Sequence, residues 1–135
     1  MMIKPAHLLS LSLLSAGLAF NAAAAHAQPP RPFSFFGVEF EDHDQRVPLA
    51  QAYVASTMAP GTSMADAEAA ARRAVARCSR PGFDGVVDCR ESSSQRPAGR
   101  GMDDVLWLVR ITPAPDGTVA GAVVTRTVEI GRAHV

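Results

Sequence analysis

Apolar residues change their spacing along this chain, from a helical period in its first half to a two-residue alternation in its second half. In residues 47–58, Leu49 and Val54 each stand four residues before another large apolar side chain, and Pro48 suits the first position of a helix. We therefore predict a short helix over residues 47–58, which ends at the Pro-Gly pair just beyond it.

A second helix is predicted over the stretch TSMADAEAAARRAVARCS, residues 62–79. Ser63 can cap its first turn, and acidic side chains stand early while arginines stand late, an order that complements the helix dipole. One apolar stripe runs along this helix and consists of Met64, Ala67, Ala71, Val75 and Cys78. The stripe predicts that Cys78 lies on the buried face of the last helical turn.

Three strands are predicted after the helices, at residues 86–92, 103–112 and 118–128. In the first strand, alternation places Val87 and Cys89 on the same face. The second strand carries four apolar side chains on one face, namely Val105, Trp107, Val109 and Ile111. Each of these strands therefore has one face suited to a core.

Residues of turn and loop type separate the strands. Residues 92–101 are rich in Ser, Gly and Pro and are predicted to be a loop, and the Asp116-Gly117 pair supplies the positive φ of a tight turn. Two helices followed by a three-stranded meander pack most economically with both helices on one face of the sheet. The sequence therefore predicts a single α+β domain over residues 47–128, with two short helices on a small antiparallel sheet of at least three strands.

Residues 28–46 precede the first predicted helix and are expected to be an extended lead-in, because their prolines disfavour a helix. This segment contains four aromatic side chains, Phe33, Phe35, Phe36 and Phe40. Large aromatics usually stabilise a fold by burial, so the segment is interpreted as a cover over the core. The alternative is an exposed patch in which Phe35 and Phe36 contact a partner.

The first 27 residues have the three regions of a signal peptide. Lys4 begins a weakly basic start, residues 8–20 form an apolar run too short to span a membrane, and Ala25-His26-Ala27 offers a small-x-small cleavage site. No cysteine follows the apolar run, so a lipid anchor at that site is not expected. We expect export to the periplasm of a Gram-negative bacterium or to the extracellular space.

Cleavage would leave 108 of the 135 residues, which is the size of one domain. It would also remove the single lysine, so that 12 arginines face 13 acidic residues and the net charge is near −1. That balance argues against general binding to nucleic acid or to anionic membranes. No other apolar run is long enough to be expected to span a bilayer.

Two cysteines in an exported chain favour one disulfide. Cys78 is expected at the inward face of a helix end and Cys89 at the inward face of the next strand, which brings both sulfurs to the same helix–sheet interface. A metal pair needs further soft ligands nearby, and a redox pair usually has C-x-x-C spacing at a helix start. A structural Cys78–Cys89 bridge is therefore the preferred interpretation.

The stretch from Pro60 to about Val128 resembles the repeat unit of secreted β-lactamase-inhibitor proteins and, more widely, the small BamE/SmpA outer-membrane assembly lipoproteins. The matching features are a Gly61-Thr62 turn into a helix, a cysteine at the helix end and a second cysteine in the first strand. The resemblance implies two helices packed on a small antiparallel sheet. The chain differs in showing one unit instead of two and in lacking a lipid-bearing cysteine.

Candidate chemistry is concentrated around His43. Glu41, His43 and Asp44 are the weak candidates for a metal site, although their spacing is not that of an EF-hand and a solvated acidic segment is the alternative. Asp103 and Asp104 are adjacent in a predicted strand, so they should face opposite ways and make a poor acid/base pair. We expect no cofactor.

The second predicted helix carries a basic face formed by Arg72, Arg73 and Arg77. This face can recognise an acidic partner or a carboxylate, and an ordinary solvated face is the alternative. The sequence thus favours an exported protein-binding or envelope-assembly module without catalysis, whose partner is another envelope or secreted protein. The alternative function is a small hydrolase or metal-dependent enzyme that uses His43 and its neighbouring acids.

In this interpretation, the last seven residues, EIGRAHV, do not belong to the native protein. They resemble the translated start of a widely used sequencing adapter. Residues 129–135 are therefore predicted to be a non-native tail, with native sequence ending at about Val128. Under this hypothesis, a further strand or a second unit of the native protein is missing from the sequence.

Overall fold

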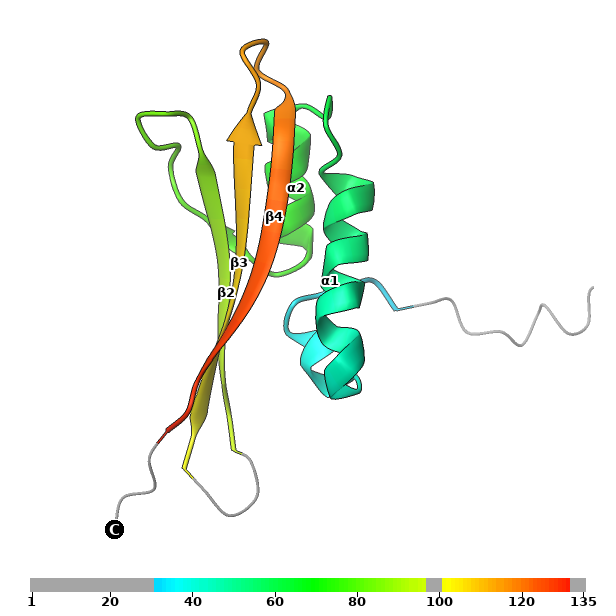
Figure 1. The fold of residues 1–135 in the computed structure, drawn as a ribbon, viewed down its shortest axis with the longest axis vertical. Coiled ribbons are helices and arrows are strands. Elements are labelled where there is room, and N and C mark those ends of the chain that lie inside the picture. The colour runs from blue at the N-terminus through cyan, green and yellow to red at the C-terminus, as the bar shows by residue number, and fades with distance from the viewer. Residues whose placement is uncertain (1–30, 97–100, 132–135) are drawn as a thin grey trace, which may run out of the picture. The chain divides into compact units, whose positions relative to one another are not determined.

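A computed structural model of the chain describes residues 31–96 and 101–131. Its elements are, in chain order, the 3₁₀ turn η2 (Gly37–Phe40), the helices α1 (His43–Thr57) and α2 (Met64–Arg73), and the strands β1 (Arg77–Cys78), β2 (Val87–Gln95), β3 (Asp103–Pro113) and β4 (Val119–Glu129). The strands form one antiparallel sheet in the order β1-β2-β3-β4 (Figure 1). The predicted α+β architecture, with helices before strands, is confirmed.

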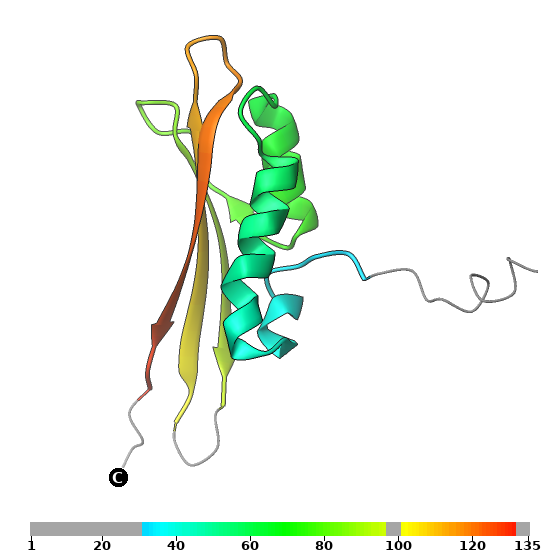
Figure 2. The ribbon, with the colours of Figure 1, turned by 45° about the vertical axis from the view of Figure 1, so that its right-hand side comes forward.

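Both helices lie on one face of the sheet, and Figure 2 shows the two layers from the side. The inner face of β3 is apolar because every second residue points to the helices, as predicted. Its apolar inward side chains, Val105, Trp107, Val109 and Ile111, are all buried, as is Asp103 at the start of the same face. Val87 and Cys89 on β2 are buried beside them. Ala50 and Val54 of α1, and Met58 at its C-cap, cover the core on the helix side.

The first helix begins four residues earlier than predicted, at His43, and Pro48 lies inside it. The expected extended lead-in is therefore wrong over residues 37–46, where η2 and the start of α1 are found. Pro48 lacks the N–H that would bond to the carbonyl of Asp44, but Asp44 is exposed, so water can satisfy that carbonyl. The Tyr53 hydroxyl donates to the carbonyl of Ala70 at 2.7 Å and ties α1 to α2.

The second helix ends six residues earlier than predicted, at Arg73. Its cap at Ser63 is confirmed, because the Ser63 hydroxyl accepts a hydrogen bond from the N–H of Asp66. The C-terminus closes with two bonds, from Ala76 N–H to the Ala71 carbonyl and from Val75 N–H to the Arg72 carbonyl, which is the Schellman pattern. Val75 takes the left-handed position, with φ of 71°, and is exposed instead of lying in the apolar stripe.

Two further differences concern the sheet. Cys78 lies in the short strand β1 and not in a helix, so the sheet has a fourth strand. The predicted loop at residues 92–101 is wrong in its first part, because β2 continues to Gln95. The turn before β4 is as predicted, with Gly117 at a φ of 82°.

Candidate functional site

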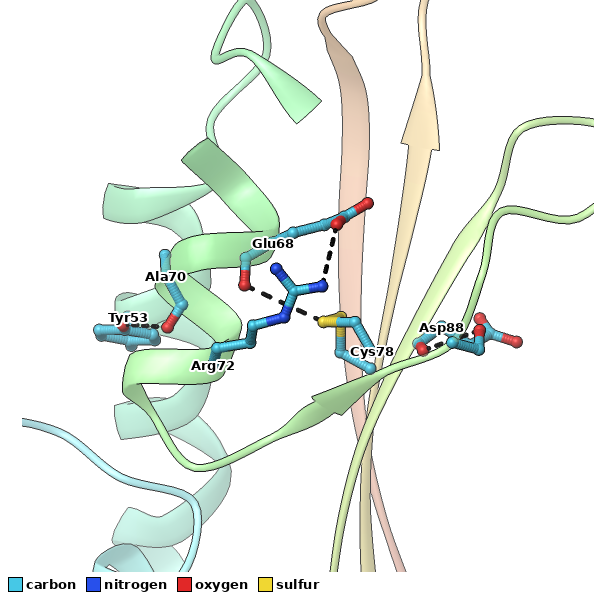
Figure 3. Close-up of a disulfide and its surroundings, with 8 residues drawn as sticks. Tyr53, Glu68, Ala70, Arg72, Cys78 and Asp88 are labelled. Atoms are coloured by element: carbon cyan, nitrogen blue, oxygen red, sulfur yellow. Dashed lines mark hydrogen bonds and ion pairs between the residues drawn. A yellow bond between two sulfur atoms is a disulfide. The ribbon is translucent and has the colours of Figure 1, made fainter. Parts of the chain in front are cut away.

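The disulfide joins the two strands at one edge of the sheet. Cys78 and Cys89 are bonded to each other and are also direct partners in the β1–β2 pairing, with their Cα atoms 3.9 Å apart. Cys78 Sγ lies 4.0 Å from the carbonyl oxygen of Glu68, so the bridge also contacts α2 (Figure 3). The predicted bridge is confirmed, although it staples strand to strand where a helix-to-strand bridge was expected.

Beyond this bridge the edge of β2 is open. The pairing with β1 stops at Arg77 opposite Arg90, whereas β2 continues to Gln95. Ser79 N–H donates to the Asp88 carbonyl at 2.9 Å, so Asp88 directs its backbone polar groups toward β1. Alternation along the strand gives Ser92 and Ser94 the same direction. Within the described part of the chain, no strand pairs with β2 on that side after Arg90.

A shallow depression of about 660 Å³ lies along this edge. It is lined by residues of the α2–β1 connection, β1 and β2, namely Val75, Arg77, Cys78, Ser79, Arg90, Glu91 and Ser92. We call these residues, together with the open edge through Ser94, the β1–β2 edge surface. Three features of this surface are energetically unfavourable in the folded protein without a partner.

The first feature is a pair of like charges. Arg77 and Arg90 are direct partners in the antiparallel pairing, an arrangement that is destabilising between like charges. Both side chains are exposed, and neither forms a salt bridge within the described residues. The charge of Arg90 helps to lower the pKa of Asp88, but the first cause of that lowering is the pair of hydrogen bonds from Arg110.

The second feature is Val75. A β-branched residue in the left-handed region is a conformational outlier that costs about 1–2 kcal/mol. Its side chain is 57% exposed, so burial does not offset this cost. Strained residues of this kind concentrate at functional sites.

The third feature is a pair of unpartnered polar atoms. Glu91 Oε2 and Ser93 Oγ are buried on the inner face of β2, and neither has a hydrogen-bond partner among the residues that the structure describes. Burial raises the pKa of Glu91, and the nearby charge of Glu39 raises it further. A buried acceptor or hydroxyl without a partner costs roughly 1–3 kcal/mol.

Glu39, from the turn η2, is the charged group that Glu91 faces. Its carboxylate accepts hydrogen bonds from Trp107 Nε1 at 2.9 Å, from Gln95 Nε2 at 3.0 Å and from both Nε and Nη2 of Arg126. Arg46 adds a second positive charge at 3.6 Å. Burial raises the pKa of Glu39, but the bonds from Arg126 and Trp107 outweigh it, so the net pKa is lowered.

Sequence reasoning missed this network because Glu39 stands directly before the acidic segment at residues 41–44 and shows no separate pattern. The missed signal is the position of Glu39 between aromatic residues, in FFGVEF, a setting that favours burial. Its partner Arg126 stands among the inward positions of β4, opposite Trp107. The hydrogen-bond network around Glu39 therefore reaches β2 at Gln95, close to the open edge of that strand.

The predicted arginine cluster is divided by the structure. Arg72 is exposed on α2 and pairs with Glu68 at 3.4 Å (Figure 3). Arg73 is also exposed at the end of α2. Arg77 belongs to β1 and joins Arg90 in the β1–β2 edge surface, a combination that the helical prediction did not contain.

The predicted aromatic contact residues are also separated. Phe35 is fully buried in the core and is not available to a partner in this structure, which agrees with the interpretation of the segment as a core cover. Phe36 is 51% exposed and stacks edge-on with the exposed Phe40. Of Phe35 and Phe36, only Phe36 is exposed enough to contact a partner.

The residues around His43 stay on the surface. Glu41, His43 and Asp44 are all exposed at the start of α1. In residues 31–96 and 101–131, no three His, Cys, Asp or Glu side chains are placed to hold a metal ion. Asp103 is buried and Asp104 is exposed, so these two acids face opposite ways as predicted.

Comparison with known proteins gives no match to a family model, to a curated protein or to a solved structure. The resemblance to the β-lactamase-inhibitor and BamE/SmpA proteins therefore stays a prediction. No helix in the described part of the chain is long and apolar enough to cross a membrane. The predicted signal peptide lies outside the described residues, and the tail hypothesis stays a prediction for residues 129–135.

Proposed function

We propose that this protein is a small exported module without catalytic activity, and that it binds another envelope or secreted protein through the β1–β2 edge surface. One observation carries the proposal: three unfavourable features converge on one depression at an open sheet edge. Sequences satisfy local rules elsewhere in a fold and break them at functional sites. A partner that supplies negative charge, apolar contact and hydrogen-bonding groups would offset the like charges, the exposure of Val75 and the unpartnered polar atoms.

The proposal is tested by site-specific crosslinking in the cells that produce the protein. A photoreactive amino acid is placed at Ser92, which is exposed on the surface. Its crosslinks are compared with those of a protein that also carries Arg77→Glu and Arg90→Glu. We expect a defined crosslinked protein with the first protein and its loss with the second, because the charge of the edge is reversed.

Arg72→Glu is the matched control. It reverses one arginine charge, where the edge variant reverses two, on α2 outside the depression, and should leave the crosslink intact. If Arg72→Glu removes the crosslink and the edge variant keeps it, the basic face of α2 is the binding surface and the proposal is wrong. Equal crosslinking by all three proteins also contradicts it.

The alternative of a hydrolase or metal-dependent enzyme at His43 receives no support from the geometry. Its three candidate residues are exposed and are not joined by further ligands among the described residues. We therefore put forward one function only.

A further inference from the structure

We infer that the partner binds by strand addition: an extended, acidic segment of the partner continues the line of β1 along the open edge of β2. This inference rests on the proposed function and specifies how the β1–β2 edge surface would be used. Edge strands with unpaired backbone groups bind extended segments through main-chain hydrogen bonds, and side chains then provide specificity.

The backbone of β2 provides the template. Ser92 and Ser94 direct their N–H and carbonyl groups away from β3, as Asp88 does toward Ser79. An added strand antiparallel to β2 follows the direction of β1, which already pairs with β2 in that sense. The disulfide at Cys78–Cys89 fixes the end of β1, so the template begins at a rigid point.

The outer side of this edge selects for negative charge. Residues of the added strand opposite Ser92 and Ser94 would point to the outer face, because side chains alternate. Arg90 is the diagonal neighbour of the position opposite Ser92, and Arg77 stands beside Arg90. A carboxylate there would separate the two like charges and form charge-assisted hydrogen bonds with them.

The inner side selects for hydroxyl or amide side chains. The register of β1 places Ala76 next to Glu91, so the first inward position of an added strand lies opposite Ser93, whose Oγ has no hydrogen-bond partner among the described residues. The hydroxyl of a threonine at that position can accept a hydrogen bond from Ser93 Oγ. The unpartnered Ser93 hydroxyl is therefore a contact for the added strand that is independent of the arginine charges and of the open backbone groups.

The probe is an acetylated and amidated synthetic peptide, Thr-Asp-Thr-Asp-Thr-Asp-Thr, whose carboxylates all lie on one side when it is extended. Binding to the oxidised full chain is measured by calorimetry. We expect binding that weakens with salt, and a loss of roughly tenfold or more with Arg77→Gln plus Arg90→Gln. Arg72→Gln is the control and should change the affinity little.

Backbone methylation tests strand addition without altering the protein. Two further peptides carry N-methyl groups on alternate residues, one on the threonines and one on the aspartates. In an added strand, only the N–H groups of alternate peptide residues bond to β2. The peptide that is methylated on those residues should lose binding, and the other methylated peptide should keep it. Binding should also slow the amide hydrogen exchange of Ser92 and Ser94.

The outcomes separate the two proposals. Equal binding by both methylated peptides, or unchanged exchange at Ser92 and Ser94, overturns strand addition but leaves an acidic partner at this surface. Absence of peptide binding while the crosslink at Ser92 persists overturns the acidic extended segment alone. Loss of the crosslink as well overturns the proposed function.

Discussion

Replacement of Glu39 by glutamine should destabilise the fold more than any other isosteric change of a charged side chain described above. The carboxylate is 2% exposed and the Arg126 side chain that faces it is 11% exposed. Glu39→Gln keeps the shape but removes the charge that accepts from Trp107, Gln95 and Arg126. The guanidinium of Arg126 is then left largely buried beside an uncharged amide.

The expected loss follows from these contacts. Removing one member of a buried ion pair costs about 3–5 kcal/mol, because the other charge stays desolvated. The lower end of that range applies here, since Arg126 keeps some solvent contact. A loss of about 3 kcal/mol lowers the Tm of a domain of this size by roughly 12–24 °C, and it is a large part of an ordinary total stability of about 5–15 kcal/mol.

Urea unfolding measures this loss directly. The chain has one tryptophan, Trp107, whose indole N–H bonds to Glu39, so its fluorescence reports on the network. Glu41→Gln is the control, since Glu41 is exposed and its neutralisation should change stability by no more than about 0.5 kcal/mol. If Glu39→Gln costs less than about 1 kcal/mol, the carboxylate is not the structural anchor described here.

The pH dependence gives the same prediction a second test. The pKa of Glu39 is lowered in the folded state, so its contribution is fully present above the unfolded pKa of about 4.3. That contribution is lost as the pH falls through the lower folded pKa. The stability gap between the wild type and Glu39→Gln should therefore be constant near neutral pH and shrink in acid. A gap that does not change down to strongly acidic pH contradicts the reasoning.

Three further changes have defined outcomes. Cys78→Ser with Cys89→Ser removes a disulfide between residues 11 apart in sequence and should lower the free energy of unfolding by about 2–3 kcal/mol. Urea unfolding measures this loss, and a reductant should lower the stability of the wild type only. Val75→Gly should raise the Tm, because glycine tolerates a φ of 71°, whereas no change would show that the position is unstrained. Glu91→Gln should stabilise the protein at pH 7 but not below pH of about 4, as measured by thermal unfolding. The reason is that the pKa of Glu91 is raised in the folded state, so its charged form is penalised above the unfolded pKa. An equal effect at both pH values argues against this.

The repeating patterns in the sequence predicted the architecture well. Alternation identified β3 well, because its inward residues from Val105 to Ile111 are apolar and the turn after it contains Asp116-Gly117. The cysteine pairing was also predicted, since two cysteines in a chain that is expected to be exported favour one disulfide. These features depend on local patterns that one sequence displays.

Element ends were predicted less well because competing local signals decide them. Val75 continues an apolar stripe in sequence, yet it closes α2 in a left-handed conformation that valine rarely adopts. Pro48 suggested a helix start, although a surface helix accommodates it where the lost bond faces water. In both positions a tertiary arrangement outweighed the propensity of the residue.

The candidate site depends on contacts between distant residues and was therefore only partly visible. Arg77 was identified from its charge, but its opposition to Arg90 follows from the register of β1 on β2. The unpartnered Glu91 becomes apparent only when the inner face of β2 is assembled. The periodic patterns of the sequence predict neither the Arg77–Arg90 pairing nor the lack of a partner for Glu91.

The central claim is that the β1–β2 edge surface binds an extended acidic segment. Its most direct test is a titration of the isotopically labelled, oxidised protein with the alternating threonine–aspartate peptide, followed by amide chemical shifts. We predict that the largest changes occur in residues 77–79 and 90–95, with small changes in α2 and β4. Largest changes at Arg72 and Arg73 of α2, or no changes at saturating peptide, would contradict the claim.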